Sequence, residues 1–302
     1  MKESTSLYQF MQEYPDESAA VKFFENRRWA NGVCCAKCGS DNVASCKNAK
    51  PMPYRCRTCR KHFSVRTGTI LAESKLPLHK WLMAIYMLHT ARKGVSSVQM
   101  AKMLGVTQKT AWFLNHRIRQ AMAHRGGLLA GTIEVDETYI GGKERNKHAS
   151  KRQNAGRGAV GKQAVVGMKQ RDGKVRAFPI QRTDKITLQS AIVENVSRGS
   201  TLYTDSFPSY NRLKGYRHEA VAHNVGEYVR GQIHTNGVES FWSLLKRGYV
   251  GTHHWMSFKH LHRYVDEFAY RHNTGVDNLM VTIAQTIDGM LNRRLTYAGL
   301  IA

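Results

Sequence analysis

Acidic residues are scarce in this chain of 302 residues: 22 Asp and Glu stand against 46 Lys and Arg, a formal net charge of +24 with neutral histidines. So large a surplus of one sign opposes compaction unless a polyanion neutralises it, which excludes an ordinary metabolic enzyme as the default interpretation. Apolar residues make up 42% of the chain, enough for folded cores in about two domains. Nucleic acid is the first candidate partner, and an acidic membrane surface is the second.

Long hydrophobic runs are also missing. The longest strongly apolar stretch, 81–88, falls far short of the roughly 20 residues that a membrane-spanning helix needs. The first 14 residues contain no apolar segment of the kind found in secretory signals. We therefore expect a protein that crosses no membrane and stays in the reducing cytoplasm, where disulfides are rare.

Cysteine is absent after residue 59, and all six cysteines lie between positions 34 and 59. Two Cys-x-x-Cys pairs in this cluster have the spacing of a structural zinc site, because four thiolates surround the ion and leave no position for water. The predicted zinc ligands are Cys35, Cys38, Cys56 and Cys59. Cys34 is a register-shifted alternative ligand, and Cys46 has no partner at a suitable spacing. Buried thiols without a metal are the alternative interpretation.

Residues 77–124 follow the helical period and contain, at 96–119, a segment typical of a helix-turn-helix motif. Ala101 is small where two helices would cross, Gly105 would turn the chain, and Thr107 would cap the second helix. The side chains expected to contact DNA bases or phosphates are Gln108, Lys109, Thr110, Asn115, Arg117 and Arg119. An ordinary packing unit of three helices is the alternative.

Beyond Gly126-Gly127 the hydrophobic period changes from helical to alternating, which indicates a second domain. The pattern predicts strands at 132–140, 163–169, 175–182, 200–205 and 219–223, and helices at 183–196, 236–247, 257–272 and 277–294. A loop at 143–162 carries seven basic residues and one acidic residue. It is either a solvated loop or a clamp for DNA phosphates.

Three carboxylates in this second half occupy separate predicted elements and can converge. Asp136 lies inside an apolar strand, Asp205 ends another strand, and Glu239 begins a helix. Acidic side chains are costly inside strands unless a cation compensates them, and a pair of Mg²⁺ ions needs several carboxylates. Lys246 follows Glu239 by seven positions, on the same helix face, where it could hold a phosphate. In so basic a chain, each acid taken alone could equally be an ion-pair partner.

The motifs together resemble a known family. They comprise RWANGVCCAKCGS, YRCRTCRKHFSVRTGTI, IEVDETYIGGK, LYTDSFPSY and HTNGVESFWSLLKRGYVGTHHWMSFKHLHRYVDEFAYRHN. In this order they are similar to the bacterial insertion-sequence transposases of the ISXO-like group, over nearly the whole chain. The resemblance implies a catalytic domain of the DDE class with a ribonuclease H-like fold. It also implies cutting and joining of DNA at transposon ends with two Mg²⁺ or Mn²⁺ ions.

Carried over residue by residue, the resemblance makes Asp136 and Asp205 the first two metal-binding aspartates and Lys246 the downstream lysine. The third ligand varies in this group among Glu, Asn and His, and both Glu239 and Asn236 are available here. Glu239 is preferred, because a carboxylate binds a hard cation more strongly than an amide. From its position alone, Asn236 is better suited to capping the helix.

We therefore expect a multidomain protein of the α+β or α/β class. Its predicted parts are a helical segment at 1–30, a zinc ribbon at 31–72, a helix-turn-helix region at 77–125, a ribonuclease H-like mixed sheet flanked by helices at 130–275, and a C-terminal helix at 276–302. The predicted function is a DNA transposase that works as a homodimer or larger complex on terminal inverted repeats and target DNA, in the bacterial cytoplasm and at the nucleoid. The alternatives are a DNA-binding regulator without catalysis and a metal-dependent nuclease of the same fold.

Overall fold

The chain folds into two compact units, and the first is discontinuous in sequence. Residues Met1–Met122 and Val276–Ala302 form the first unit and Ala123–Gly275 the second. The computed structural model describes residues 5–123, 126–142, 144–152, 159–221, 233–275, 278–291 and 293–301. The segment expected to be a separate C-terminal helix thus belongs to the first unit. No helix in the described ranges is long and apolar enough to span a bilayer.

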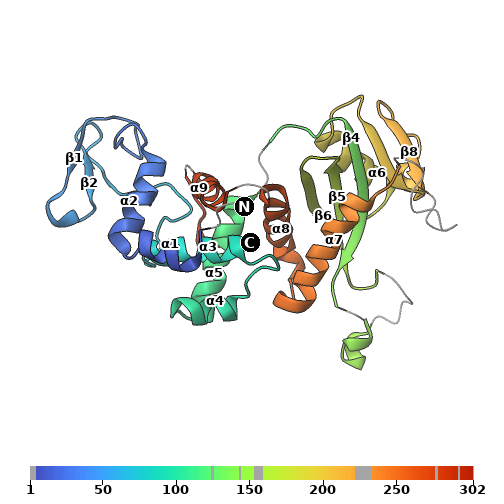
Figure 1. Ribbon diagram of the computed structural model, residues 1–302, viewed down its shortest axis with the longest axis horizontal. Helices are drawn as coiled ribbons and strands as arrows, with labels where there is room; N and C mark the ends of the chain where they lie inside the picture. Colours follow the sequence, from blue (N-terminus) through green and yellow to red (C-terminus); the bar gives the residue numbers. More distant parts are fainter. Residues whose placement is uncertain are drawn as a thin grey trace. The chain divides into compact units, whose positions relative to one another are not determined.

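The cysteine region forms a small antiparallel sheet of three strands, β1 (Val43–Ser45), β2 (Tyr54–Cys56) and β3 (His62–Phe63), in that order (Figure 1). An aromatic cluster supports it. Trp29 packs edge-on against Tyr54 and Phe63, with ring centroids 5.7 and 5.9 Å away, and the latter two rings stack on each other. So small a sheet buries little apolar surface, which is why a metal cluster is expected to stabilise it.

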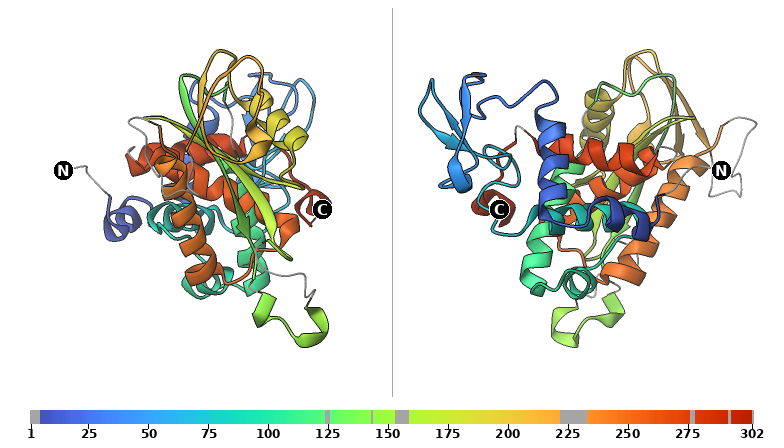
Figure 2. Two further views of the ribbon diagram at one scale, coloured as in Figure 1. Left: turned by 90° about the vertical axis from the view of Figure 1, so that its right-hand side faces the viewer. Right: turned by 60° about the vertical axis from the view of Figure 1, so that its left-hand side comes forward.

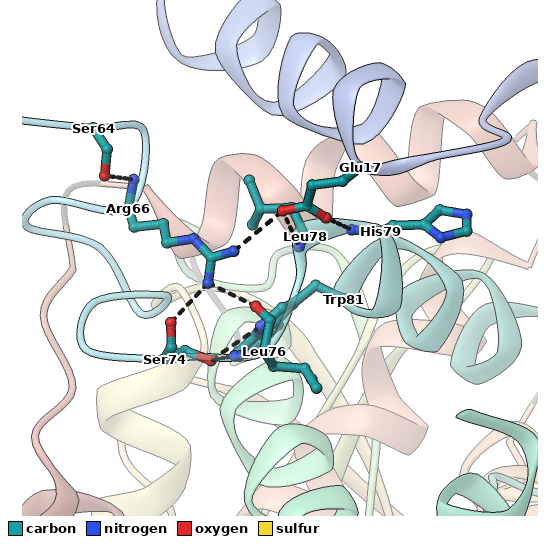
Figure 3. A network of polar contacts seen from close by, with 8 residues as sticks. All are labelled: Glu17, Ser64, Arg66, Ser74, Leu76, Leu78, His79 and Trp81. Atoms are coloured by element: carbon teal, nitrogen blue, oxygen red, sulfur yellow. Dashed lines mark hydrogen bonds and ion pairs between the residues drawn. The ribbon is translucent and has the colours of Figure 1, made fainter. Parts of the chain in front are cut away.

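Three helices flank the zinc ribbon in the sequence: α1 (Leu7–Glu13), α2 (Glu17–Arg28) and α3 (Leu78–Thr90). Glu17, the first residue of α2, accepts hydrogen bonds from the backbone N–H groups of Leu78 and His79 at 2.8 Å and so caps α3 (Figure 3). The guanidinium of Arg66 contacts Glu17 and donates to the carbonyls of Ser74 and Leu76. This network ties the segment after the zinc ribbon to the helices.

The predicted helix-turn-helix segment consists of α4 (Ser97–Leu104) and α5 (Gln108–Met122). Ser96 caps α4, and Gly105 adopts the left-handed conformation (φ 59°) that ends it. The Thr107 hydroxyl accepts from the N–H of Thr110, as expected of a cap on α5. Ala101 is buried where the two helices pack together.

The C-terminal segment completes this helical core. Helix α9 (Leu279–Met290) packs against α2, α3 and α5, and α10 (Tyr297–Ile301) contacts α5. Gly289 of α9 lies directly against the backbone of α5: a Cβ at this position would be 2.3 Å from the carbonyl oxygen of Ala121. The approach of the two helices therefore requires glycine here.

The second unit is built on a five-stranded mixed sheet with the order β6-β5-β4-β7-β8. The strands are β4 (Thr132–Ile140), β5 (Gln163–Gln170), β6 (Val175–Ile180), β7 (Thr201–Asp205) and β8 (Arg217–Val221). The first three pair antiparallel as a meander, whereas β7 and β8 run parallel to β4. This order and direction define a ribonuclease H-like sheet, so the predicted fold class is confirmed.

Helices cover both faces of the sheet (Figures 1 and 2). Helix α6 (Lys185–Asn195) supplies Leu188 and Ile192 to the core on one face. Helices α7 (Asn236–Gly248) and α8 (Leu261–Thr274) supply the core on the other. Along β4 the side chains alternate, so that Ile133 and Val135 belong to the α6 face. The even-numbered residues from 134 to 140 consequently face α7.

We expect Gly289→Ala to lower the free energy of unfolding of the first unit by about 1–3 kcal/mol, because the added methyl group forces α9 away from α5. Urea denaturation followed by circular dichroism measures the change. Gly299→Ala in α10 is the matched control, since its Cβ meets no atom closer than 3.4 Å. Equal stability of the two variants would contradict the packing described here.

Candidate active site

Helix α7 presents two different faces. Val238, Phe241, Trp242 and Leu245 recur at helical spacing and are buried against the sheet and α8. Glu239 and Lys246 are exposed and, with Ser243, line a cavity beside the sheet. The sequence of α7 therefore anchors the helix through one face and offers a carboxylate and an ammonium group through the other.

The cavity has a volume of about 680 Å³. Asp136 enters it from the middle of β4, and Asp205 enters it from the last position of β7, the strand beside β4 in the sheet. The cavity thus gathers all four residues that the sequence predicted for catalysis. Its lining consists of Asp136, Glu137, Thr138, Asp205, Glu239, Trp242, Ser243, Lys246, Arg247 and Val250.

The indole of Trp242 orients Asp136. Its Nε1 donates a hydrogen bond of 2.9 Å to Asp136 Oδ2. Asp136 pairs across the sheet with Gly167 of β5, and a Cβ on Gly167 would lie 2.5 Å from the indole ring. Glycine at this register position is what lets the tryptophan reach the carboxylate. Trp242 is therefore a buried neighbour of the site, with 3% of its surface exposed, and is unavailable for stacking on a base.

A buried glutamate fixes the start of α7. Glu134, only 2% exposed, accepts a hydrogen bond of 3.0 Å from the backbone N–H of Val238. Arg171 donates to the same carboxylate at 3.2 Å, and a Cβ on Gly237 would collide with it at 2.7 Å. A carboxylate at a helix N-terminus is stabilised by the unpaired N–H groups and the helix dipole. Glu134 thereby sets where Glu239, one residue beyond Val238, lies relative to the sheet.

Two neighbouring carboxyl groups in the cavity have raised pKa values. Burial, and secondarily the charges of Asp205 and Glu239, raise the pKa of Asp136 to about 6. Burial also raises the pKa of Glu137 to about 7, against the opposing effect of a hydrogen bond from the Tyr210 hydroxyl. Ionising these groups without a cation is unfavourable, so the cavity favours the entry of positive charge.

None of the carboxylates of Asp136, Asp205 and Glu239 makes an ion pair with another described residue. Ordinary ion pairing therefore does not account for them. The hydroxyl of Thr235 and the N–H of Phe207 donate to Glu239 and Asp205, respectively. Within the described ranges, only cysteines bring three or more potential ligand atoms within 4.8 Å of one another, so the carboxylates are spaced more widely.

The two candidates for the third ligand occupy different positions. Glu239 lines the cavity, whereas Asn236 is the exposed first residue of α7 and is not part of the lining. The predicted capping role of Asn236 is wrong, because the cap position belongs to Thr235 and the N–H of Val238 is satisfied by Glu134.

The predicted zinc ligands lie together in the ribbon. The sulfurs of the four cysteines 35, 38, 56 and 59 are within 4.8 Å of one another. The Sγ–Sγ distances are 3.6 Å for Cys35–Cys59 and for Cys38–Cys56, close to the edge of about 3.8 Å of a tetrahedron with Zn–S bonds of 2.3 Å. Cys34 lies outside the cluster, and Cys46 is 3.6 Å from His62 Nδ1. The cluster suggests a structural zinc ion.

The side chains predicted to contact DNA differ in their exposure to solvent. Gln108 and Lys109 are exposed and Thr110 is partly exposed, all in the first turn of α5, where recognition helices contact bases. Asn115 and Arg119 are buried, with 1% and 2% of their surfaces exposed, so their predicted contact with DNA is wrong. The guanidinium of Arg117 donates to the carbonyl of Ile70.

In the predicted phosphate clamp at 143–162, residues 143 and 153–158 lie outside the described residues.

Sequence reasoning missed Glu134, Glu137 and the hydrogen bond from Trp242. The strand IEVDE contains three acids, and its alternation places Glu134 beside Asp136 on one face of β4. This alternation is visible in the sequence, but it does not show whether an acidic side chain holds a helix in place or binds a metal. Gly167 and Gly237 leave room for Trp242 and Glu134, respectively, but a single sequence does not distinguish them from other glycines.

Two parts of the chain match known families. Residues 128–273 match the ISXO2-like transposase domain, and residues 15–62 match the transposase zinc-ribbon domain. The first match contains every residue of the cavity described above. The second begins before α2 and includes all six cysteines.

A relative from a transposable element agrees with these assignments. The chain is 29% identical over 271 residues to an uncharacterized protein in transposable element ISH50 of the archaeon Halobacterium salinarum, covering 85% of this chain and 91% of that protein. The likeness is thus not confined to bacteria. A chain of a simian T-cell lymphotropic virus intasome in complex with a PP2A regulatory subunit is 15% identical, with a TM-score of 0.30. The similarity covers 61% of this chain and 65% of that chain. This overall similarity is low, and the fold assignment rests on the strand order.

We expect Cys56→Ser to lose the bound metal, because three thiolates and a hydroxyl hold zinc less well than four thiolates. The zinc content of the purified full chain, measured by atomic emission, should fall from about one ion per chain to well below one. Cys34→Ser and Cys46→Ser are matched controls and should keep their zinc. Loss of zinc in Cys34→Ser would shift the ligand register by one residue.

We expect Glu134→Ala to lower the free energy of unfolding of the second unit by about 2–3 kcal/mol, because it removes a buried acceptor from Val238 and Arg171. Urea denaturation measures the loss. Glu219→Ala, at an exposed position of β8, should stay within about 0.5 kcal/mol of the parent protein. A loss no greater than that of the control would show that Glu134 does not anchor α7.

Proposed function

This chain is an ISXO2-like transposase with an N-terminal zinc ribbon, and we propose that it binds the ends of an insertion sequence and catalyses metal-dependent cleavage and strand transfer of DNA there. The observation that carries the proposal is the single cavity shared by Asp136, Asp205, Glu239 and Lys246. The fold supports it, since strand β7 brings Asp205 to the same cavity as Asp136 of β4. The domain is of the DDE class.

Asp136, Asp205 and Glu239 would hold the two divalent ions. Such ions, when bound, activate a water or a 3′-hydroxyl and stabilise the leaving oxygen of a phosphodiester. The donor set fits Mg²⁺ or Mn²⁺, because all three ligands are hard carboxylate oxygens. The burial that chiefly raises the pKa of Asp136, together with the nearby charges of Asp205 and Glu239, favours the same occupants.

The remaining residues would position the substrate. Lys246 is exposed at the cavity, so its ammonium can bind a non-bridging oxygen of the reacting phosphate. Arg247 lines the same cavity and offers a second cation. The Trp242 indole keeps one oxygen of Asp136 engaged and so limits the orientations of the carboxylate.

The first unit would hold the DNA ends. The exposed first turn of α5, with Gln108, Lys109 and Thr110, is the element best suited to a DNA groove. The zinc ribbon would add backbone contacts, supported by the net charge of +24. Because two transposon ends must be joined at one target, the proposed active form is a dimer or larger complex on DNA.

We expect Asp136→Asn, Asp205→Asn and Glu239→Gln each to lower Mg²⁺-dependent strand cleavage at least about 100-fold, since removal of a ligand costs more than loss of its supporting contacts. The substrate is duplex DNA carrying the sequence that flanks this gene. Gel electrophoresis measures nicked and joined products, and a mobility-shift assay checks that DNA binding is retained. Asn236→Ala, at the exposed start of α7, is the control and should keep most activity.

Other outcomes separate the alternatives. Unchanged cleavage in Asp136→Asn and Asp205→Asn would exclude this site and leave a DNA-binding regulator. Nicked donor DNA without any joined product would indicate a nuclease of the same fold. Loss of activity in Asn236→Ala but not in Glu239→Gln would make the amide the third ligand.

A further inference from the structure

The segment that follows α7 displays two aromatic side chains to solvent. After the π-helical turn Tyr249–His253, Trp255 is 60% exposed and Phe258 is 39% exposed. Their ring centroids are 6.2 Å apart at an interplanar angle of 32°, so the two rings form one surface. An exposed tryptophan is costly in water, and large exposed apolar side chains grouped together indicate a binding surface.

The backbone that carries these rings is held in place. Tyr249 and Met256 are buried in the core formed with α7 and α8, and Met256 is only 1% exposed. The His253 ring packs edge-on against Tyr264 of α8, with centroids 5.0 Å apart. Trp255 therefore lies between two anchored residues, and its exposure is a property of a fixed segment.

A groove of about 580 Å³ connects this segment with the catalytic cavity. Lys246 and Val250 line both hollows, and His254, which precedes Trp255, lines the groove. The lining also includes Lys162, and none of the described residues that line the groove is acidic. Lys259, next to Phe258, is exposed as well. The carboxyl groups thus lie in the cavity, whereas two lysines line the groove and a third lies next to the aromatic pair.

We propose that Trp255 and Phe258 form a stacking platform for an unpaired base of the DNA strand that passes from the carboxylate cavity through this groove. Lys162 and Lys246 bind the phosphates of that strand. The inference rests on the proposed function, because it takes the cavity to be the place where a DNA phosphate reacts.

Charge and chemistry favour this occupant. A base offers a flat apolar face to the rings, and the phosphates on either side of it match the lysines. A protein partner would need an acidic and apolar segment of its own, whereas DNA combines both features in every nucleotide. Stacking of this kind is independent of base sequence, so it suits a strand whose sequence changes with each target site.

The test compares two probes on the full chain with zinc bound and without Mg²⁺, by fluorescence anisotropy. The probes are an oligo(dT) of about 20 nucleotides, longer than the usual site of a single-strand binding fold, and a duplex of the same length. We expect Trp255→Ala to weaken oligo(dT) binding about 5- to 100-fold and duplex binding less than about twofold. Trp255→Phe keeps an aromatic face and should stay within about threefold of the parent protein.

Controls make the result specific. Tyr8→Ala removes an aromatic side chain that is 72% exposed on α1 and should change neither probe. Lys162→Ala should weaken both probes and lower the salt dependence of binding, because it removes a phosphate contact. Circular dichroism establishes that each variant is folded.

The proposal is overturned if Trp255→Ala leaves oligo(dT) binding unchanged or weakens both probes equally. Its failure is distinguishable from failure of the proposed function, since the binding assay needs no catalysis. Asp136→Asn should bind oligo(dT) normally while cleaving no DNA. A chain that stacks DNA but never cleaves would keep this inference and lose the other.

Discussion

The placement of α7 on the sheet is the constraint on which the site depends. Glu239 and Lys246 are both carried by this helix, whereas the two aspartates belong to strands. A buried carboxylate at the first turn of α7 and an indole about one turn further along join the helix to β4 at two points. Each contact needs a glycine opposite it, Gly237 in one case and Gly167 in the other. Carboxylates from three distant parts of the sequence thereby line one cavity.

Electrostatics makes this hollow unusual in a strongly basic chain. With 46 cationic side chains available, burial of an acid would ordinarily be offset by pairing, as Arg171 does for Glu134. Asp136 instead is buried beside other carboxyl groups, and its pKa is raised chiefly by this burial and secondarily by the charges of Asp205 and Glu239. Ionising these groups is costly unless a cation lies beside them, which is the physical argument for the divalent ions that we propose in the cavity.

The sequence predicted the elements and the zinc cluster well because both follow local rules. Strand alternation, helical period and Cys-x-x-Cys spacing each act within a few residues. The gathering of Asp136, Asp205 and Glu239 was a hypothesis from residue type and family likeness. The roles of Asn115 and Arg119 were mistaken, because a helix-turn-helix pattern does not say which polar side chains of its second helix turn inward. Contacts such as Glu134 with Val238 span more than a hundred residues and leave no local pattern.

The discontinuity of the first unit has a consequence for biosynthesis. Helix α9 is an integral part of the helical core, packed on α2, α3 and α5, yet it is translated after the whole of the second unit. The whole of the second unit is therefore synthesised while the amino-terminal helices still lack α9. The core of the first unit is therefore complete only when translation is nearly finished, and a polypeptide truncated before α9 lacks part of that core.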